Sequence, residues 1–295
     1  MKEAIRAMQD AMERFGYIAE PEIATAVFLA KEMGKPLLIE GDAGVGKTEV
    51  AKVLARILDT ELIRLQCYEG LDVQTALYEW DYPKQMLRVR MGEDEGRSAD
   101  EIESVIYSRD YLLERPILRA ITRTGAPPVL LVDEIDRADD GFEAFLLEVL
   151  SDFQVTIPEL GTVRAERPPF VVLTSNRTRE IGDALRRRCL YLYIEHPSLE
   201  KEIRILRTRV PGASERLAAE IGRFVQALRA RQLLKTPGVA ESIDWAQALV
   251  RLHREHLDVE TVERTLGCIL KDRHDMADVG GEALEAMVGE AVAMG

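Results

Sequence analysis

Eight residues decide the fold of this chain: Gly41-Asp42-Ala43-Gly44-Val45-Gly46-Lys47-Thr48. They fit the pattern G-x-x-x-x-G-K-[ST], in which glycines let backbone N–H groups turn toward one centre and cradle phosphate oxygens. An apolar run at residues 36–39 precedes the stretch, and a helix-like segment at 48–58 follows it. This strand–loop–helix context favours a phosphate-binding loop over a glycine-rich turn that binds nothing.

The residues at the end of the stretch have distinct expected roles. Lys47 can reach the β- and γ-phosphates of a nucleotide, and the Thr48 hydroxyl can coordinate Mg²⁺. The amino terminus of the following helix adds a favourable dipole for an anion. Glu49, the next residue, is included in the predicted nucleotide-binding set.

Composition limits the class of protein. The 295 residues are enough for one large or two medium domains, and 46% of them are hydrophobic, enough for a packed core. A net charge of −13 disfavours binding to nucleic acid phosphates. Three scattered cysteines, no secretory leader and no run of 18 apolar residues predict a cytoplasmic protein without a membrane span.

The order of segments predicts the fold class. Two helices are expected within residues 1–34, separated by Gly16 and Pro21. Five segments read as strands of a parallel sheet: 36–40, 61–67, 129–132, 170–174 and 190–194, of which all but 61–67 are mainly apolar runs. Helices that cross between such strands give an α/β/α sandwich with a parallel sheet.

A second domain is expected after His196-Pro197, because the pattern there becomes almost entirely helical. We expect an α/β nucleotide-binding domain at 1–196 and an all-helical lid domain at 197–295. The expected lid helices are 199–208, 214–231, 243–257, 259–270 and 281–294.

Polar residues follow two of the predicted strands. Asp133 and Glu134 end the run at 129–132, where Asp133 can hold Mg²⁺ and Glu134 can orient and polarise water. In isolation they fit an ordinary helix start equally well, but ligands in open α/β sheets bind at the carboxyl ends of strands. Asn176 ends the run at 170–174 and can position the same water, although a plain turn is the alternative.

Three adjacent arginines, Arg186-Arg187-Arg188, precede the last strand. Such a run is often only a solvated face. An arginine here can also reach the γ-phosphate on a neighbouring subunit, which is worth about 10³–10⁵ in rate where it occurs.

In this order, the strand, loop, acids, asparagine, arginines and helical lid resemble the AAA+ ATPases over essentially the whole chain. The resemblance implies ATP hydrolysis with ATP and Mg²⁺ as cofactors, in a ring of identical subunits, a hexamer. It implies Walker A at 41–48, Walker B at Asp133 and Glu134, sensor 1 at Asn176 and an arginine finger at Arg188 with Arg187 next. It also places Tyr17-Ile18 against the adenine.

Two insertions resemble the MoxR branch of this family. Residues 153–166 read as a hairpin before the Asn176 strand, and the passage from Tyr68 to Gly125 is too long for one crossover helix, with a helix-2 insertion at about 84–112. Asp133-Glu134-Ile135-Asp136-Arg137-Ala138 matches the branch's DEINRA motif with Asp for Asn. The branch commonly has a sensor 2 arginine, but residues 239–243 contain none.

Within that branch, residues 68–72, 77–85, 112–116 and 241–246 resemble the CoxD group. The resemblance implies a chaperone that helps to mature a molybdenum hydroxylase such as carbon monoxide dehydrogenase, beside a partner with a von Willebrand A domain. A DNA-directed AAA+ motor is the first alternative, and a small-molecule P-loop kinase is the second. The net charge disfavours the motor, and a kinase does not need a water-activating Glu134.

Two further features are interpreted as structural. His253 and His256 are three apart on an expected helix, where a solvated face is favoured over a metal site. The aromatic residues at 78–82 can stack on a ligand, but an anchor for the insertion is favoured.

Overall fold

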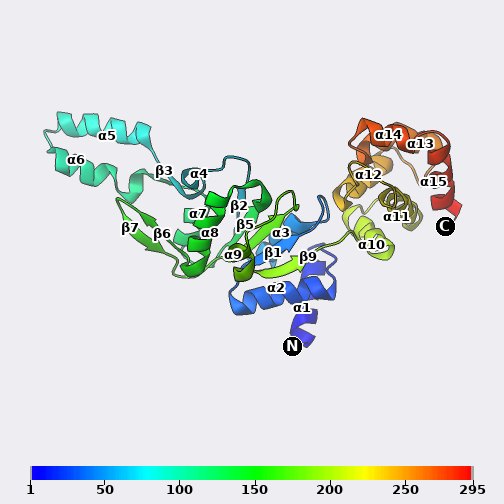
Figure 1. Cartoon of the computed structure of the whole chain (residues 1–295), viewed down its shortest axis with the longest axis horizontal. Coiled ribbons are helices and arrows are strands. Elements are labelled where there is room, and N and C mark those ends of the chain that lie inside the picture. Colours follow the sequence, from blue (N-terminus) through cyan, green and yellow to red (C-terminus); the bar gives the residue numbers. More distant parts are fainter. Residues whose placement is uncertain (1, 294–295) are drawn as a thin grey trace. The chain divides into compact units, whose positions relative to one another are not determined.

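The computed structural model describes residues 2–293, which divide into two compact units. One unit contains residues 2–24, 41–50 and 193–293, and the other contains residues 25–40 and 51–192. The chain therefore passes between the units several times, whereas the sequence suggested one boundary near residue 196. Figure 1 shows the elements of both units.

A five-stranded sheet organises the α/β part of the chain (Figure 1), in the order β2-β5-β8-β1-β9. The pairs β2–β5, β5–β8 and β1–β8 are parallel, which confirms the predicted parallel sheet. The strands are β1 (Leu37–Glu40), β2 (Leu62–Gln66), β5 (Val129–Asp133), β8 (Phe170–Ser175) and β9 (Leu190–Tyr193).

The register of the sheet aligns the strand ends. Gln66 pairs with Asp133, and Glu40 pairs with Ser175, so the last residues of four strands meet at one edge. All of β1 and β5 is buried, as expected for central parallel strands covered on both faces. The acids and the asparagine predicted from sequence therefore leave the sheet at its carboxyl edge.

Two helices precede the first strand of the sheet, and others lie in the connections between the later strands. They are α1 (Lys2–Arg14), α2 (Pro21–Met33), α3 (Lys47–Ile57), α7 (Pro116–Thr122), α8 (Asp140–Asp152) and α9 (Asp183–Arg188). Phe142 and Leu146 of α8 pack with Leu130 and Val132 of β5 in one apolar core. This core fixes the strand ends that carry the polar residues.

The segment between β2 and α7 forms an extension. It contains α4 (Val73–Leu77), β3 (Tyr78–Trp80), α5 (Tyr82–Asp94), α6 (Ala99–Ile106), a 3₁₀ turn (Arg109–Tyr111) and β4 (Leu112–Glu114), with β3 and β4 antiparallel. Figure 1 shows α5 and α6 side by side. Trp80 is buried and packs edge-on against Tyr107 at 5.3 Å between ring centroids, which fits the anchor interpretation. Tyr82 differs, because it is exposed.

A short hairpin precedes β8. Strands β6 (Gln154–Ile157) and β7 (Gly161–Arg164) are antiparallel, and Gly161 begins the second strand at φ +77°. The segment lies within the stretch in which the alternating sequence pattern predicted a hairpin.

Six helices make up the rest of the chain: α10 (Leu199–Arg209), α11 (Glu215–Arg229), α12 (Val239–Arg251), α13 (Val259–Ile269), α14 (Arg273–Val279) and α15 (Glu282–Ala293). The helix expected at 243–257 was misplaced. It begins at Val239, because the Glu241 carboxylate accepts a hydrogen bond from Gly238 N at 3.0 Å and caps the helix there.

The same helix ends at Arg251, and His253 has a left-handed φ of +54°, so His253 and His256 lie beyond the helix rather than on one of its faces. Helix α14 was not predicted; Asp272 caps it through His274 N at 2.8 Å. The last expected helix corresponds to α15, except for Met294, which is outside the described residues.

Candidate functional site

The loop at Gly41–Gly46 has the backbone conformation that its glycines allow. Gly41, Gly44 and Gly46 have φ of +154°, +77° and +97°. A Cβ atom on Gly41 would lie 2.2 Å from the carbonyl oxygen of Ile194, so no larger residue fits there. The loop thus arranges its backbone groups as a cradle, and the conformation at these three positions favours glycine.

Lys47 is the first residue of α3 and is only 6% exposed. Its ammonium group donates hydrogen bonds to the carbonyl oxygens of Gly41 at 2.8 Å and Asp42 at 2.6 Å. These contacts hold the positive charge over the loop. The loop leads directly into the amino terminus of α3, where the helix dipole favours an anion.

A pocket beside this loop is formed within one unit. Tyr17 and Ile18, from the turn between α1 and α2, line it together with Gly44, Val45 and Gly46. Both side chains are buried, and burial, with smaller contributions from Glu20 and Glu49, raises the pKa of the Tyr17 hydroxyl, which therefore stays protonated. The structure thus places Tyr17 and Ile18 against the loop, where the sequence expected an adenine contact.

Helix α10 contributes two cations to the same pocket that the sequence analysis did not identify. Arg209 Nη1 lies 3.0 Å from Glu49 Oε1, and Lys201 Nζ lies 2.9 Å from Glu20 Oε2. Lys201, Ile205 and Arg209 are four residues apart and line the pocket from one face of α10. This spacing is the sequence signal that could have found them.

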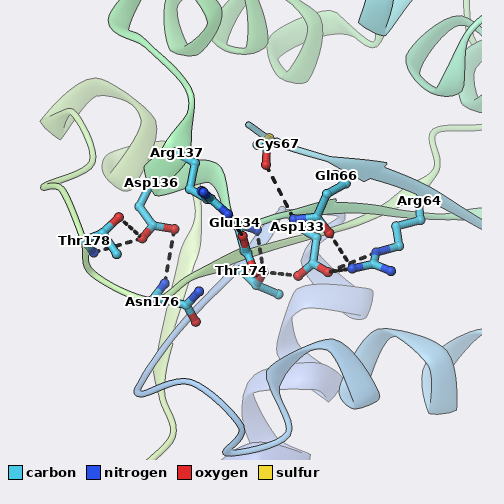
Figure 2. Close-up of polar contacts among 10 residues, drawn as sticks. All are labelled: Arg64, Gln66, Cys67, Asp133, Glu134, Asp136, Arg137, Thr174, Asn176 and Thr178. Atoms are coloured by element: carbon cyan, nitrogen blue, oxygen red, sulfur yellow. Dashed lines mark hydrogen bonds and ion pairs between the residues drawn. The ribbon is translucent and has the colours of Figure 1, made fainter. Parts of the chain in front are cut away.

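Asp133 lies at the end of β5 and is 3% exposed (Figure 2). Its Oδ1 accepts a hydrogen bond from the Thr174 hydroxyl at 2.5 Å, and its Oδ2 accepts from Arg64 Nε at 3.0 Å and Nη2 at 2.5 Å. The Arg64 guanidinium also donates to Gln66. The buried carboxylate is thus held in one orientation by a neutral and a charged donor.

Glu134 adopts an unusual backbone conformation directly after Asp133. Its φ and ψ of 55° and 50° are left-handed, which costs a residue with a side chain about 1–2 kcal/mol. Its N–H donates to Thr174 Oγ1 at 3.0 Å, and its carboxylate accepts from Arg137 Nη1 at 3.2 Å. Thr174 therefore bonds both acids at once, and this link holds Glu134 in its strained conformation.

Asp136 fixes the loop that carries Asn176 (Figure 2). Its Oδ1 accepts from Asn176 N at 3.2 Å, while its Oδ2 accepts from Thr178 N at 2.9 Å and from the Thr178 hydroxyl at 2.6 Å. An ionised carboxylate accepts at both oxygens, whereas an asparagine amide offers one. The Asp in place of the expected Asn in the 133–138 motif therefore has a structural reason.

The three consecutive arginines of α9 have different environments. Arg186 Nη2 pairs with Glu40 Oε1 at 2.9 Å, and Glu40 is 2% exposed. Arg188 Nη1 donates to the carbonyl oxygen of Leu147 at 2.8 Å. The Arg187 side chain is 84% exposed and lies 3.9 Å from Asp183. Arg186 therefore supports the sheet, while Arg187 and Arg188 remain the predicted finger residues.

The sequence of residues 36–189 matches the AAA domain (dynein-related subfamily). The chain belongs to this AAA family. The matched range contains the phosphate loop, both acids of β5, Asn176 and the three arginines. It thus includes residues of both units described above.

Curated relatives are more distant. The chain is 27% identical over 209 residues to the gas vesicle ATPase GvpN of Haloferax mediterranei, which covers 68% of this chain and 58% of GvpN. It is 30% identical over 175 residues to the chaperone protein ClpB of Streptomyces albus G, covering 59% of this chain and 17% of ClpB. The match thus spans less than two thirds of either relative.

Among solved structures, an alanine-to-serine mutant of RuvB from Thermotoga maritima is similar, with a TM-score of 0.51 and 16% identity. The match covers 91% of this chain and 71% of the RuvB chain. At this identity the likeness concerns the fold. Within residues 2–293, no helix is long and apolar enough to cross a lipid bilayer.

Proposed function

We propose that this chain binds and hydrolyses ATP and uses the free energy to remodel another protein. The loop at Gly41–Gly46 carries the proposal, because its left-handed glycines and the buried Lys47 form a cradle suited to phosphates. Membership of the AAA family supports it. Two relatives, one named an ATPase and one a chaperone, support the link between hydrolysis and remodelling.

The proposed binding roles follow from the chemistry of each group. Lys47 and the loop N–H groups bind the β- and γ-phosphates, and Tyr17 and Ile18 contact the base. Thr48 and Asp133 would hold Mg²⁺, which neutralises charge on the phosphate oxygens when bound. The residues fit this ion, because Mg²⁺ uses one or two carboxylates beside the phosphates, and Asp133 places a carboxylate at the carboxyl end of β5, where ligands of such sheets bind.

The proposed hydrolytic roles belong to three residues. The Glu134 carboxylate orients a water molecule and takes its proton, and Asn176 positions the same water. Arg188, with Arg187 next to it, acts on the γ-phosphate of a neighbouring subunit. This division of labour requires a ring, for which we propose a hexamer that works in the cytoplasm.

For the client we propose a molybdenum hydroxylase such as carbon monoxide dehydrogenase, matured with the help of a von Willebrand A domain protein. The support is the resemblance of residues 68–72, 77–85, 112–116 and 241–246 to the CoxD group of the MoxR branch. The extension at 78–114, built from β3, α5, α6 and β4, adds a surface at the place where the helix-2 insertion was expected.

The test compares Glu134→Gln with Glu263→Gln, a surface change on α13. We expect phosphate release by Glu134→Gln to fall about 100-fold or more, because a general base supplies that much rate, while Glu263→Gln keeps the wild-type rate. Glu134→Gln should still bind ATP and retain partner proteins in a pull-down. A Glu134→Gln variant that hydrolyses ATP at the wild-type rate contradicts the proposal, and strong stimulation by DNA at physiological salt favours a DNA-directed motor instead.

A further inference from the structure

The start of helix α12 contacts the phosphate loop through its main chain. Val239 N donates a hydrogen bond to the carbonyl oxygen of Gly44 at 2.9 Å. A Cβ atom on Gly238 would lie 2.7 Å from Gly44 Cα and 2.8 Å from Ala43 O. Gly238 has φ −85° and ψ −177°, a conformation that any residue can adopt. Glycine is therefore required here by the close approach of the loop and not by the backbone conformation.

This helix start is also firmly attached to the helices beside it. Arg229 Nε on α11 donates to the carbonyl oxygen of Pro237 at 2.9 Å. On the other side of Gly238, the Ser242 hydroxyl donates to Glu202 Oε1 of α10 at 2.8 Å. Glu202 is fully buried and makes a two-pronged pair with Arg229, at 2.6 Å and 2.8 Å. A chain of hydrogen bonds therefore links the loop at Gly44 to α10, α11 and α12.

The hydrogen bond sets the orientation of one peptide group in the loop. The Gly44–Val45 peptide is trans, and in a trans peptide the C=O and N–H groups point in opposite directions. Because the Gly44 carbonyl points to Val239, the N–H of Val45 points away from α12. This N–H belongs to the row of backbone donors that cradles phosphate in a loop of this pattern.

We propose that the Val239 N–H is a positioning group that presets the Gly44–Val45 peptide for phosphate binding. When a nucleotide binds to the loop, the hydrogen bond from Val239 N to the Gly44 carbonyl couples that binding to the position of α12. The contact stands where the MoxR resemblance leads one to expect a sensor 2 arginine, which residues 239–243 lack. The inference rests on the proposed binding of ATP.

The sharpest test is Val239→Pro, which replaces this N–H group by a ring carbon and so removes the hydrogen bond and displaces the Gly44 carbonyl. Proline suits the site, because Val239 is the first residue of α12 and Gly238 before it is extended. The matched control is Val259→Pro, at the first position of α13 after the extended Asp258. Val239→Ala trims the same side chain and keeps the N–H, so its ratio to Val239→Pro reports the loss of the main-chain contact with Gly44 rather than the loss of the side chain.

We expect Val239→Pro to bind a fluorescent ADP analogue more weakly than Val239→Ala by at least about three- to tenfold, because one net hydrogen bond supplies that factor and the displaced carbonyl adds to it. Val259→Pro should bind as wild type does. The unfolding midpoint without nucleotide should agree among the variants to within about 3 °C, the shift that roughly 1 kcal/mol produces. Equal affinities for Val239→Pro and Val239→Ala would overturn the inference, as would the same loss in Val259→Pro.

A second variant tests the same contact by adding a side chain at Gly238. Gly238→Ala inserts a methyl group between α12 and the loop, and we expect it to weaken binding of the analogue by at least as much as Val239→Pro. Gly280→Ala is its control, because Gly280 is also extended beside a helix and a Cβ there meets nothing closer than 3.5 Å. Unchanged affinity in Gly238→Ala overturns the inference alone, whereas a wild-type protein that binds neither ADP nor ATP overturns the proposed function as well.

Discussion

Thr174 is hydrogen-bonded to both Asp133 and Glu134, and Thr174→Val tests how far the two acids depend on it. The residue is 1% exposed, its hydroxyl donates to Asp133 Oδ1 at 2.5 Å, and it accepts from Glu134 N at 3.0 Å. Valine has nearly the same shape, so the change removes the two hydrogen bonds and little packing.

The magnitude follows from the two bonds that are lost. A hydrogen bond to a buried charged group contributes about 1.5–3 kcal/mol, and a neutral one contributes about 0.5–1.5 kcal/mol. Because Arg64 still pairs with Asp133, we expect a loss near the lower end, about 2–3 kcal/mol in the free energy of unfolding. For a unit of this size, that loss lowers the unfolding midpoint by roughly 4–12 °C.

Catalysis should fall as well, because Glu134 is no longer held in its left-handed conformation. Release of about 1–2 kcal/mol of backbone strain predicts a kcat for ATP hydrolysis lower by roughly five- to thirtyfold. The assays are thermal unfolding and phosphate release at saturating ATP, with Thr174→Ser as the comparison because it keeps the hydroxyl. If Thr174→Val unfolds and hydrolyses ATP as Thr174→Ser does, the bridging role of this hydroxyl is wrong.

Two further predictions concern the arginines and the buried thiol. Arg188→Ala alone should lack ATPase activity, and a mixture of Arg188→Ala with Glu134→Gln should recover part of it. The reason is that mixed rings contain interfaces that combine an intact Glu134 with an intact Arg188. If only Arg187→Ala behaves in this way, the finger is Arg187. Burial, reinforced by Asp133, raises the pKa of the Cys67 thiol to about 12. The thiol should therefore resist iodoacetamide at pH 8 until the protein is unfolded. Because the unfolded thiol ionises near pH 8.5 and the folded one does not, its contribution to stability should decline from about pH 8.5 upward, as unfolding at pH 8 and pH 10 would measure.

Much of the α/β part of the fold was predictable, because its signals are local. Buried parallel strands are continuous apolar runs, as β1, β5 and β8 are, and the five predicted segments correspond to the five strands of the sheet. The loop at 41–48 was predictable for the same reason, because its conformation depends on glycines within the loop itself. The helix at 239–251 was misplaced, because its start depends on the Glu241 cap and its end on the left-handed His253.

The residues that support the predicted site were not predictable from local pattern. Thr174 and Asp136 act on groups about 40 residues away in sequence, and Glu40 pairs with Arg186 across 146 residues. Strand register, which aligns Gln66 with Asp133 and Glu40 with Ser175, brings such groups to one edge of the sheet. No spacing rule within one segment reveals a partner on another strand.

The sequence by itself determined that this chain has a phosphate-binding loop and a parallel sheet whose strands end in acids and an asparagine, because these depend on residue type and on spacing over a few positions. Only the tertiary structure decided how those groups are held. It made Thr174 the common partner of Asp133 and Glu134, gave the three arginines different partners, and brought Val239 N to the carbonyl of Gly44. The physical reason is that a hydrogen bond needs its two groups within about 3 Å, and only the packing of distant segments sets that distance.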